Sequence, residues 1–221
     1  MTETVTQFRN HWWWREGWRV GRHFYACHIS FHHAAALHRV VDQYQQALES
    51  FPALTLIPRQ WLHLTTQGIG FIDEISDEEL NRLVGAIRGE LSRLDAPQVT
   101  FHRPEIRLEA VCLRALPPEP LHTVRDAIRA GLQGTFGADG LLELRAPTRG
   151  AFWPHVSIAY ANADAPAGPV AAALEGVETE PVKVTIDQVS LLTFHRDRQM
   201  YEWTHETAIP IGDAGQRARQ T

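Results

Sequence analysis

Apolar residues in the first half of the chain alternate between strand-like and helical spacing. Residues 23–31 (HFYACHISF) are rich in aromatic and β-branched side chains, which predicts a strand, and residues 33–50 repeat apolar side chains near helical spacing. A second strand is expected over residues 60–71 (QWLHLTTQGIGF). Residues 76–94 begin with a Ser-x-x-Glu capping box, which predicts an amphipathic helix.

The second half repeats this order of strands and helices. We expect strand-like pieces on either side of Pro104, a helix with prolines at its entry, a strand that is the counterpart of the one at 60–71, a small Ala-rich helix and a closing hairpin. These elements cover, in that order, residues 99–116, 118–136, 151–160, about 168–175, and 182–194 with 199–211. The repeated strand–helix–strand–helix order predicts an α+β fold with two similar lobes.

The composition is that of a globular protein. Apolar residues make up 44% of the chain and charged residues 21%, and no apolar run approaches the roughly 18 residues that a membrane span requires. The N-terminus lacks a hydrophobic signal core. Cys27 and Cys112 lie in apolar strand-like runs, so we expect buried free thiols. We therefore expect a soluble, cytoplasmic monomer.

The net charge restricts the kind of ligand. A net charge of −5 and a pI near 6.2 argue against a wide grip on a nucleic-acid backbone, which needs a basic stripe. A ligand with one or two phosphates needs only a few local arginines. The candidates are Arg145 and Arg149, just ahead of the strand at 151–160, together with Arg103, Arg107 and Arg114.

One short pattern occurs twice, in WLHLT at 61–65 and WPHVS at 153–157. A histidine followed two residues later by Ser or Thr occurs four times in the chain, the other two instances beginning at His28 and His205. The pair at 61–65 and 153–157 differs from these in its shared tryptophan and in its equivalent place in the two halves. The matched pair is therefore the stronger candidate for a functional site.

Alternation along a strand places the two polar side chains of each stretch together. Residues i and i+2 point to the same face, so His63 lies beside Thr65 and His155 beside Ser157, with Trp61 and Trp153 expected on the same faces. One neutral imidazole can take a proton from water or a ribose hydroxyl, and the other, protonated, can deliver one to the departing oxygen. The hydroxyls can donate to phosphoryl oxygens. These groups are sufficient for phosphoryl transfer without a metal.

At these residues the sequence resembles the two-histidine (2H) phosphoesterase superfamily, and within it the bacterial RNA 2′,3′-cyclic phosphodiesterases, also called 2′-5′ RNA ligases. The first motif of the family resembles LHLTTQGIGF, and its second, with a proline directly before the histidine, resembles WPHVSIAY. The opening strand resembles FYACHISF, and the closing strands resemble VSLLTF and MYEWTHETA. The resemblance covers roughly residues 22–211.

The resemblance implies a bilobal 2H phosphoesterase-like fold, with two pseudo-symmetric, interleaved lobes of antiparallel sheet, helices on the outside and a central groove that holds the two motifs. We accordingly divide the chain into a Trp-rich N-terminal extension (1–21), a single bilobal domain (22–211) and a flexible tail (212–221). The implied activity is that of an enzyme, without cofactor, that opens 2′,3′-cyclic phosphate ends of RNA or related nucleotides to 2′-phosphomonoesters. Reverse 2′-5′ ligation is a property of the family that the sequence does not decide here.

Within this interpretation His63 and His155 are catalytic, and Thr65 and Ser157 bind phosphate. Many members carry an arginine where this chain has Tyr160, so the phosphate-binding cation is either missing here or supplied by Arg145 or Arg149. Further substrate contacts are assigned to the remaining polar and aromatic groups around the motifs: Trp61, Trp153, Tyr160, Arg145, Arg149 and His28. The two tryptophans can equally be scaffold or stacking platforms.

Several alternatives stay open at this point. The same fold can serve 2′-5′-linked or cyclic nucleotide signals, or bind RNA ends without turnover. The segment HWWWREGWR at 11–19 is either a flap packed on the body or a stacking lip over a ligand. The residues do not say which imidazole is the acid, and His63 as acid with His155 as base is a working assignment. No metal site is expected, because His28 and His32 would lie about 13 Å apart on a strand without a Cys or carboxylate partner.

Overall fold

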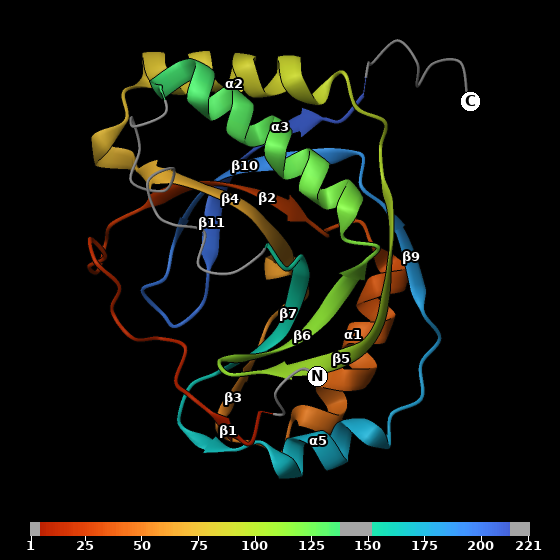
Figure 1. The fold of residues 1–221 in the computed structure, drawn as a ribbon. Helices are drawn as coiled ribbons and strands as arrows, with labels where there is room; N and C mark the ends of the chain where they lie inside the picture. The colour runs from red at the N-terminus through yellow and green to blue at the C-terminus, as the bar shows by residue number, and fades with distance from the viewer. Residues whose placement is uncertain (1–4, 138–151, 213–221) are drawn as a thin grey trace.

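The computed structural model describes residues 5–137 and 152–212, and it contains two antiparallel sheets between two pairs of helices (Figure 1). The first sheet has the strand order β11-β10-β2-β4, and the second has the order β3-β7-β6-β5-β9. The strands of the first sheet are β2 (Phe24–Ser30), β4 (His63–Phe71), β10 (Gln188–His195) and β11 (Glu202–Pro210). Those of the second are β3 (Leu54–Leu56), β5 (Gln98–Arg107), β6 (Ala110–Leu116), β7 (His155–Ala161) and β9 (Val182–Thr185).

Each sheet has its own pair of covering helices. The helices are α1 (Ala35–Leu48), α2 (Asp77–Leu91), α3 (Glu119–Phe136) and α5 (Gly168–Glu175). Helices α2 and α3 pack on each other and contact the first sheet, whereas α1 and α5 contact each other and α1 contacts the second sheet. Figure 1 shows the two pairs on opposite sides of the molecule. None of the described helices is long and apolar enough to cross a membrane.

The predicted α+β fold with two lobes of antiparallel sheet is confirmed, and each half of the chain contributes strands to both sheets. In the first half, β2 and β4 join the first sheet while α1 and β3 belong to the second. In the second half, β7 joins the second sheet while β10 and β11 complete the first. The two motif strands, β4 and β7, therefore belong to different sheets, and they pack against each other. Cys27 and Cys112 are buried free thiols, as expected.

Two predicted boundaries are wrong. Residues 182–194 form two strands, because β9 pairs with β5 in the second sheet and β10 pairs with β2 and β11 in the first. Pro104 lies inside β5, and the chain reverses at residues 108–109 instead. A proline is tolerated there because β9 pairs only with residues 98–101, so β5 is an edge strand on that side at Pro104.

The helix 76–94 begins as predicted, with a complete capping box in which Ser76 and Glu79 satisfy each other's backbone N–H groups. The buried face of this helix, α2, consists of Leu83, Ile87 and Leu91. It packs on α3 at Gly131, where an added Cβ would lie 2.9 Å from the backbone nitrogen of Ile87. The absence of a side chain at Gly131 is therefore what allows α2 and α3 to approach so closely.

We predict that Gly131→Ala destabilises the protein by about 1–3 kcal/mol, because the clash with the Ile87 backbone outweighs the gain in helix propensity. Gly134→Ala, on the same helix but with no atom within 4 Å of its Cβ position, is the matched control and should stabilise by up to ~1 kcal/mol. Urea unfolding midpoints of the two variants measure both effects. Equal shifts in the two variants would contradict the close approach of α2 and α3.

Candidate active site

The two motif histidines occupy the same position in their respective strands. β4 begins at His63 and β7 begins at His155. The Nδ1 atom of His63 lies 2.7 Å from the carbonyl oxygen of Trp61, and the Nδ1 atom of His155 lies 2.7 Å from that of Trp153. The chain thus builds the same local geometry twice, once in each sheet.

These hydrogen bonds fix the tautomer of both imidazoles. A carbonyl oxygen can only accept, so Nδ1 of each ring carries the proton and donates it. In the neutral ring Nε2 is then the unprotonated nitrogen, free to accept a proton from a substrate or water. Both rings are therefore oriented by the backbone with their reactive nitrogen available.

Burial lowers the pKa of both histidines. Desolvation lowers the pKa of His63 to about 4; the hydrogen bond to Trp61 opposes this, and the charge of His155 adds to it. The pKa of His155 is lowered by desolvation and by the nearby Arg107, against the hydrogen bond to Trp153. The two histidines lie on β4 and β7, and these strands pack against each other.

His63 lies among aromatic side chains that exclude water. The ring of His28 stacks on it with centroids 4.5 Å apart and an interplanar angle of 16°. Tyr201 and Trp203 approach it edge-on, at 5.9 and 5.6 Å. His63 is consequently only 7% exposed.

His28 is a third histidine at the site, on the strand next to β4. It pairs with Thr65 across β2 and β4, and its Nε2 lies 3.5 Å from the Thr65 hydroxyl. Its Nδ1 is buried and has no hydrogen-bond partner. A buried N–H without a partner is rare, so the proton belongs on Nε2, where it is donated to Thr65. Burial, with a contribution from His63, holds the pKa of His28 well below its usual value, so this ring is neutral.

The two hydroxyl residues differ in exposure. Thr65 is exposed, whereas Ser157 is buried next to the Cys112 thiol, with 3.5 Å between Oγ and Sγ. Ser157 also lies close enough to the buried phenol of Tyr160 to affect its pKa. The pairing of β6 with β7 shifts its register between Ser157 and Tyr160. Val111 pairs with Ala159, but the next residue of β6, Cys112, pairs with Ser157. This irregularity allows Tyr160 to join Ser157, which strict alternation would place on the opposite face.

Two arginines flank His155. Arg114 is its cross-strand partner in β6, and the guanidinium of Arg107 lies over the ring of Trp153, 4.5 Å from its centroid. Arg145 and Arg149, the arginines expected to supply a cation, lie outside the described residues. Within the described parts of the chain, Arg107 and Arg114 are therefore two cations that lie next to the second motif.

The two tryptophans do not lie in the strands, contrary to the prediction from alternation. Trp61 ends a short 3₁₀ turn (Arg59–Trp61) and its ring meets that of Trp203, with centroids 4.7 Å apart. Trp153 precedes β7 and its ring lies 4.6 Å from the ring of His155. The constant element of the repeated stretch is thus the tryptophan backbone carbonyl that accepts from the histidine.

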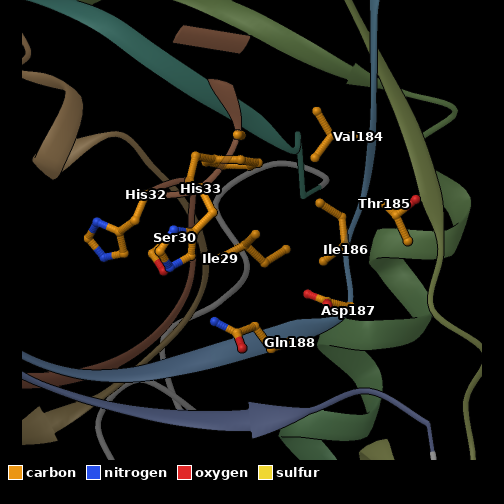
Figure 2. A pocket seen from close by; sticks show the side chains of 11 residues that line it. Ile29, Ser30, His32, His33, Val184, Thr185, Ile186, Asp187 and Gln188 are labelled. Carbon is orange, nitrogen blue, oxygen red and sulfur yellow. The ribbon is translucent and has the colours of Figure 1, made fainter. Parts of the chain in front are cut away.

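A hollow of about 300 Å³ lies one strand away from His63, at the end of β2. Figure 2 shows Ser30, His32 and His33 on one side of it and residues 184–187 on the other. Ser30 pairs with His63 across β2 and β4. The hydroxyl of Ser30 donates to Glu206, which also accepts from His32, so this side of the hollow is a connected polar cluster.

With the geometry established, the chain can be compared with known proteins. A family model described as the 2′-5′ RNA ligase superfamily matches residues 32–198. The chain belongs to this superfamily. The match contains both histidine motifs, and membership in this 2H phosphoesterase superfamily supports a phosphoesterase role. None of the curated proteins matches the chain.

Solved structures with the same fold are distant in sequence. The protein TT0787 of Thermus thermophilus is 21% identical, with a TM-score of 0.59, and the alignment covers 85% of this chain and 97% of that one. E. coli LigT complexed with 3′-AMP is 19% identical, and LigT complexed with ATP is 18% identical, each with a TM-score of 0.50 and the same coverage of both chains. At these identities the likeness concerns the fold.

Part of the site could not be anticipated from the motifs. Tyr201, Trp203, His11 and Glu109 lie far from both motifs in the sequence, and His11 stacks on Tyr160. Their only signal was aromatic and histidine density, in MYEWTH and HWWW. Among residues 5–137 and 152–212, no group of three or more His, Cys, Asp or Glu side chains is arranged to hold a metal ion.

Proposed function

We propose that this protein is a metal-independent phosphodiesterase that opens 2′,3′-cyclic phosphate ends of RNA, or of related nucleotides, by two-histidine acid–base catalysis. The observation that carries the proposal is the repeated geometry of His63 and His155. In each ring the Nδ1–H group donates a hydrogen bond to a backbone carbonyl, and Nε2 is free. Membership in the 2′-5′ RNA ligase superfamily supports the same reaction class. E. coli LigT has been crystallised with 3′-AMP and with ATP, which is consistent with a nucleotide ligand.

We take the roles of the two histidines in the opposite sense to the working assignment from sequence. His63 has a pKa of about 4 and is neutral near pH 6, which suits a base. The second motif histidine, His155, is then left to supply the proton to the departing oxygen. We therefore assign His155 as the acid.

In the proposed reaction, Nε2 of His63 takes a proton from water, and the water oxygen forms a bond to phosphorus. The bond between phosphorus and the ribose 3′ oxygen breaks, and His155 gives its Nε2 proton to that oxygen. The product is a 2′-phosphomonoester. Thr65 and Ser157 donate hydrogen bonds to the non-bridging oxygens, and the positive charges of Arg107 and Arg114 stabilise the phosphoryl group.

The test is an assay of an oligoribonucleotide that ends in a 2′,3′-cyclic phosphate, with and without excess chelator. The expected result is a 2′-phosphate end, formed at the same rate in both conditions. A panel of 2′-5′-linked oligonucleotides and cyclic nucleotides in the same assay identifies a preferred substrate of that kind. Tight binding of the RNA without turnover, or loss of turnover in chelator, would refute the proposal.

We predict a bell-shaped dependence of kcat/KM on pH, with its maximum between about pH 4 and pH 6.5. The acid limb falls as His63 takes up a proton near pH 4, which removes the base. The alkaline limb falls as His155 loses its proton, at a pKa below the usual 6.5. The bound cyclic phosphate is a monoanion and favours the protonated imidazole, so the profile of kcat should lie at higher pH than that of kcat/KM. A maximum of kcat/KM above pH 7.5 would contradict these assignments.

A further inference from the structure

The N-terminal segment of residues 5–21, here called the strap, connects the two sheets across the site. At its start, β1 (Gln7–Phe8) pairs with β8 (Ala165–Pro166), and the His11 backbone donates to the carbonyl of Ala161 at the end of β7. At its other end, Trp18 packs on phenylalanines of the first sheet, Phe24, Phe71 and Phe194. In Figure 1 this segment is the red trace that runs from β1 to β2.

The inner side of the strap contacts two tyrosines that border the paired histidines. His11 stacks on Tyr160 with centroids 4.4 Å apart and an interplanar angle of 16°. Trp12 packs on the same tyrosine and on Tyr201, at 5.3 and 5.4 Å. Because Tyr160 lies beside Ser157 and Tyr201 borders His63, the strap lies one side chain away from both motifs.

His11 is the centre of a hydrogen-bonded chain. Its Nδ1 lies 3.2 Å from a carboxylate oxygen of Glu109, and its Nε2 lies 3.0 Å from the hydroxyl of Tyr201. The carboxylate can only accept, so Nδ1 donates to it and Nε2 accepts from Tyr201. Burial lowers the pKa of His11 to about 4, with Arg15 adding to the effect, so the ring is neutral and this polarity holds at neutral pH.

The carboxylate end of this chain is itself held by the strap. Glu109 forms ion pairs with Arg9 and Arg15 and accepts from the indole nitrogen of Trp13. Arg196, which is buried, donates to the backbone carbonyls of His11 and Trp13. These contacts hold the Glu109 carboxylate and the backbone at His11 and Trp13, and so they fix the position of His11. The strap is therefore held in a defined position next to Tyr201.

We propose that the strap is a positioning element of the active site, in which His11, oriented by Glu109, fixes the ring of Tyr201 against His63 and keeps water from that side of the imidazole. This inference rests on the proposed function for its kinetic test. It extends the site beyond residues 32–198, where the superfamily model matches, because His11 and Tyr201 both lie outside that range. It also gives Tyr160 a role, since its ring is the surface on which His11 lies.

The experiment removes the hydrogen bond between His11 and Tyr201 and keeps an aromatic ring at each position. His11→Phe retains a ring on Tyr160 but cannot accept from Tyr201, and Tyr201→Phe retains the ring beside His63 but cannot donate. Each change should lower kcat about tenfold, with KM nearly unchanged, and the double variant should be no worse than either single one because all three lack the same hydrogen bond. Multiplying effects in the double variant, or full kcat in either single one, would overturn the proposal.

A readout that does not depend on turnover is the pKa of His63, followed by NMR titration of its imidazole. The titratable groups that face it or its neighbours from the packed elements are His28, His155, Tyr160, Tyr201, His11, Glu109, Arg15 and Arg196. His11→Phe should raise the pKa of His63 from about 4 towards 6.5, because water reaches the ring and the desolvation is lost.

The matched control is Trp14→Ala, in the same strap but 56% exposed, which should leave the pKa of His63 and kcat unchanged. An unchanged pKa of His63 in His11→Phe would overturn the role of the strap. If the wild-type protein turns over no cyclic phosphate, the proposed function fails, and the NMR titration still decides the inference about the strap. Thermal unfolding of each variant shows whether the fold is retained.

Discussion

Replacing either His63 or His155 with alanine should lower kcat for cyclic-phosphate RNA by roughly 10²–10⁴-fold while the fold is retained. His63→Ala removes the proposed base and His155→Ala the proposed acid. Because the two groups act in one step, the double variant should lose little more than the worse single variant. The measurement is steady-state turnover at the pH optimum, with near-ultraviolet circular dichroism to verify packing around the aromatic side chains.

The pH profiles of the two variants separate the roles. His63→Ala should lose the acid limb near pH 4, and His155→Ala should lose the alkaline limb, because each limb reports the ionisation of one of these groups. Loss of the alkaline limb in His63→Ala and of the acid limb in His155→Ala would reverse the assignment of acid and base. His205→Ala is the matched control, since His205 also begins a His-x-Thr triplet but is exposed on β11. Near-normal activity in His63→Ala or His155→Ala would remove that histidine from the mechanism.

The sequence predicts best where the determinants are local. The capping box of α2, the apolar faces of the helices at 33–50 and 76–94, and the alternation of Leu62, His63 and Leu64 all depend on residues a few positions apart. The two motifs could be paired without knowledge of the fold, because their residues match each other. In the structure each histidine uses only the backbone carbonyl of the tryptophan, and every residue type has one. The pattern therefore could not show what role the tryptophan plays.

The wrong and missing predictions involve pairing between distant parts of the chain. Residues 182–194 have continuous strand propensity, and their division into β9 and β10 depends on β5 and β2 as separate partners. The position of Tyr160 depends on an irregular register between β6 and β7. The place of His11 depends on Glu109, nearly a hundred residues away, to which it is hydrogen-bonded. Tertiary pairing decided these features, and a single sequence contains no record of it.

The second large effect is expected at the hydroxyl residues. Thr65→Val keeps the shape and β-branching of the side chain but removes its donor, and it should lower kcat by about 10²–10³-fold, as for the loss of one donor to a developing oxyanion. Ser157→Ala should act in the same direction. Lys or Arg substitutions are unsuitable here, because they would add a charge next to His155. The measurement is single-turnover cleavage, which isolates the chemical step.

His28 explains why the proton of Thr65 is available to a substrate. A hydroxyl has one proton, and the Nε2–H of His28 already occupies a lone pair of the Thr65 oxygen, so the Thr65 proton is directed to another acceptor. His28→Phe keeps a ring on His63 but removes this donor, and it should cost about tenfold in kcat. In the Thr65→Val background His28→Phe should cost almost nothing further, because the group on which it acts is gone. If the two effects multiply instead, His28 acts by a route other than its hydrogen bond to Thr65.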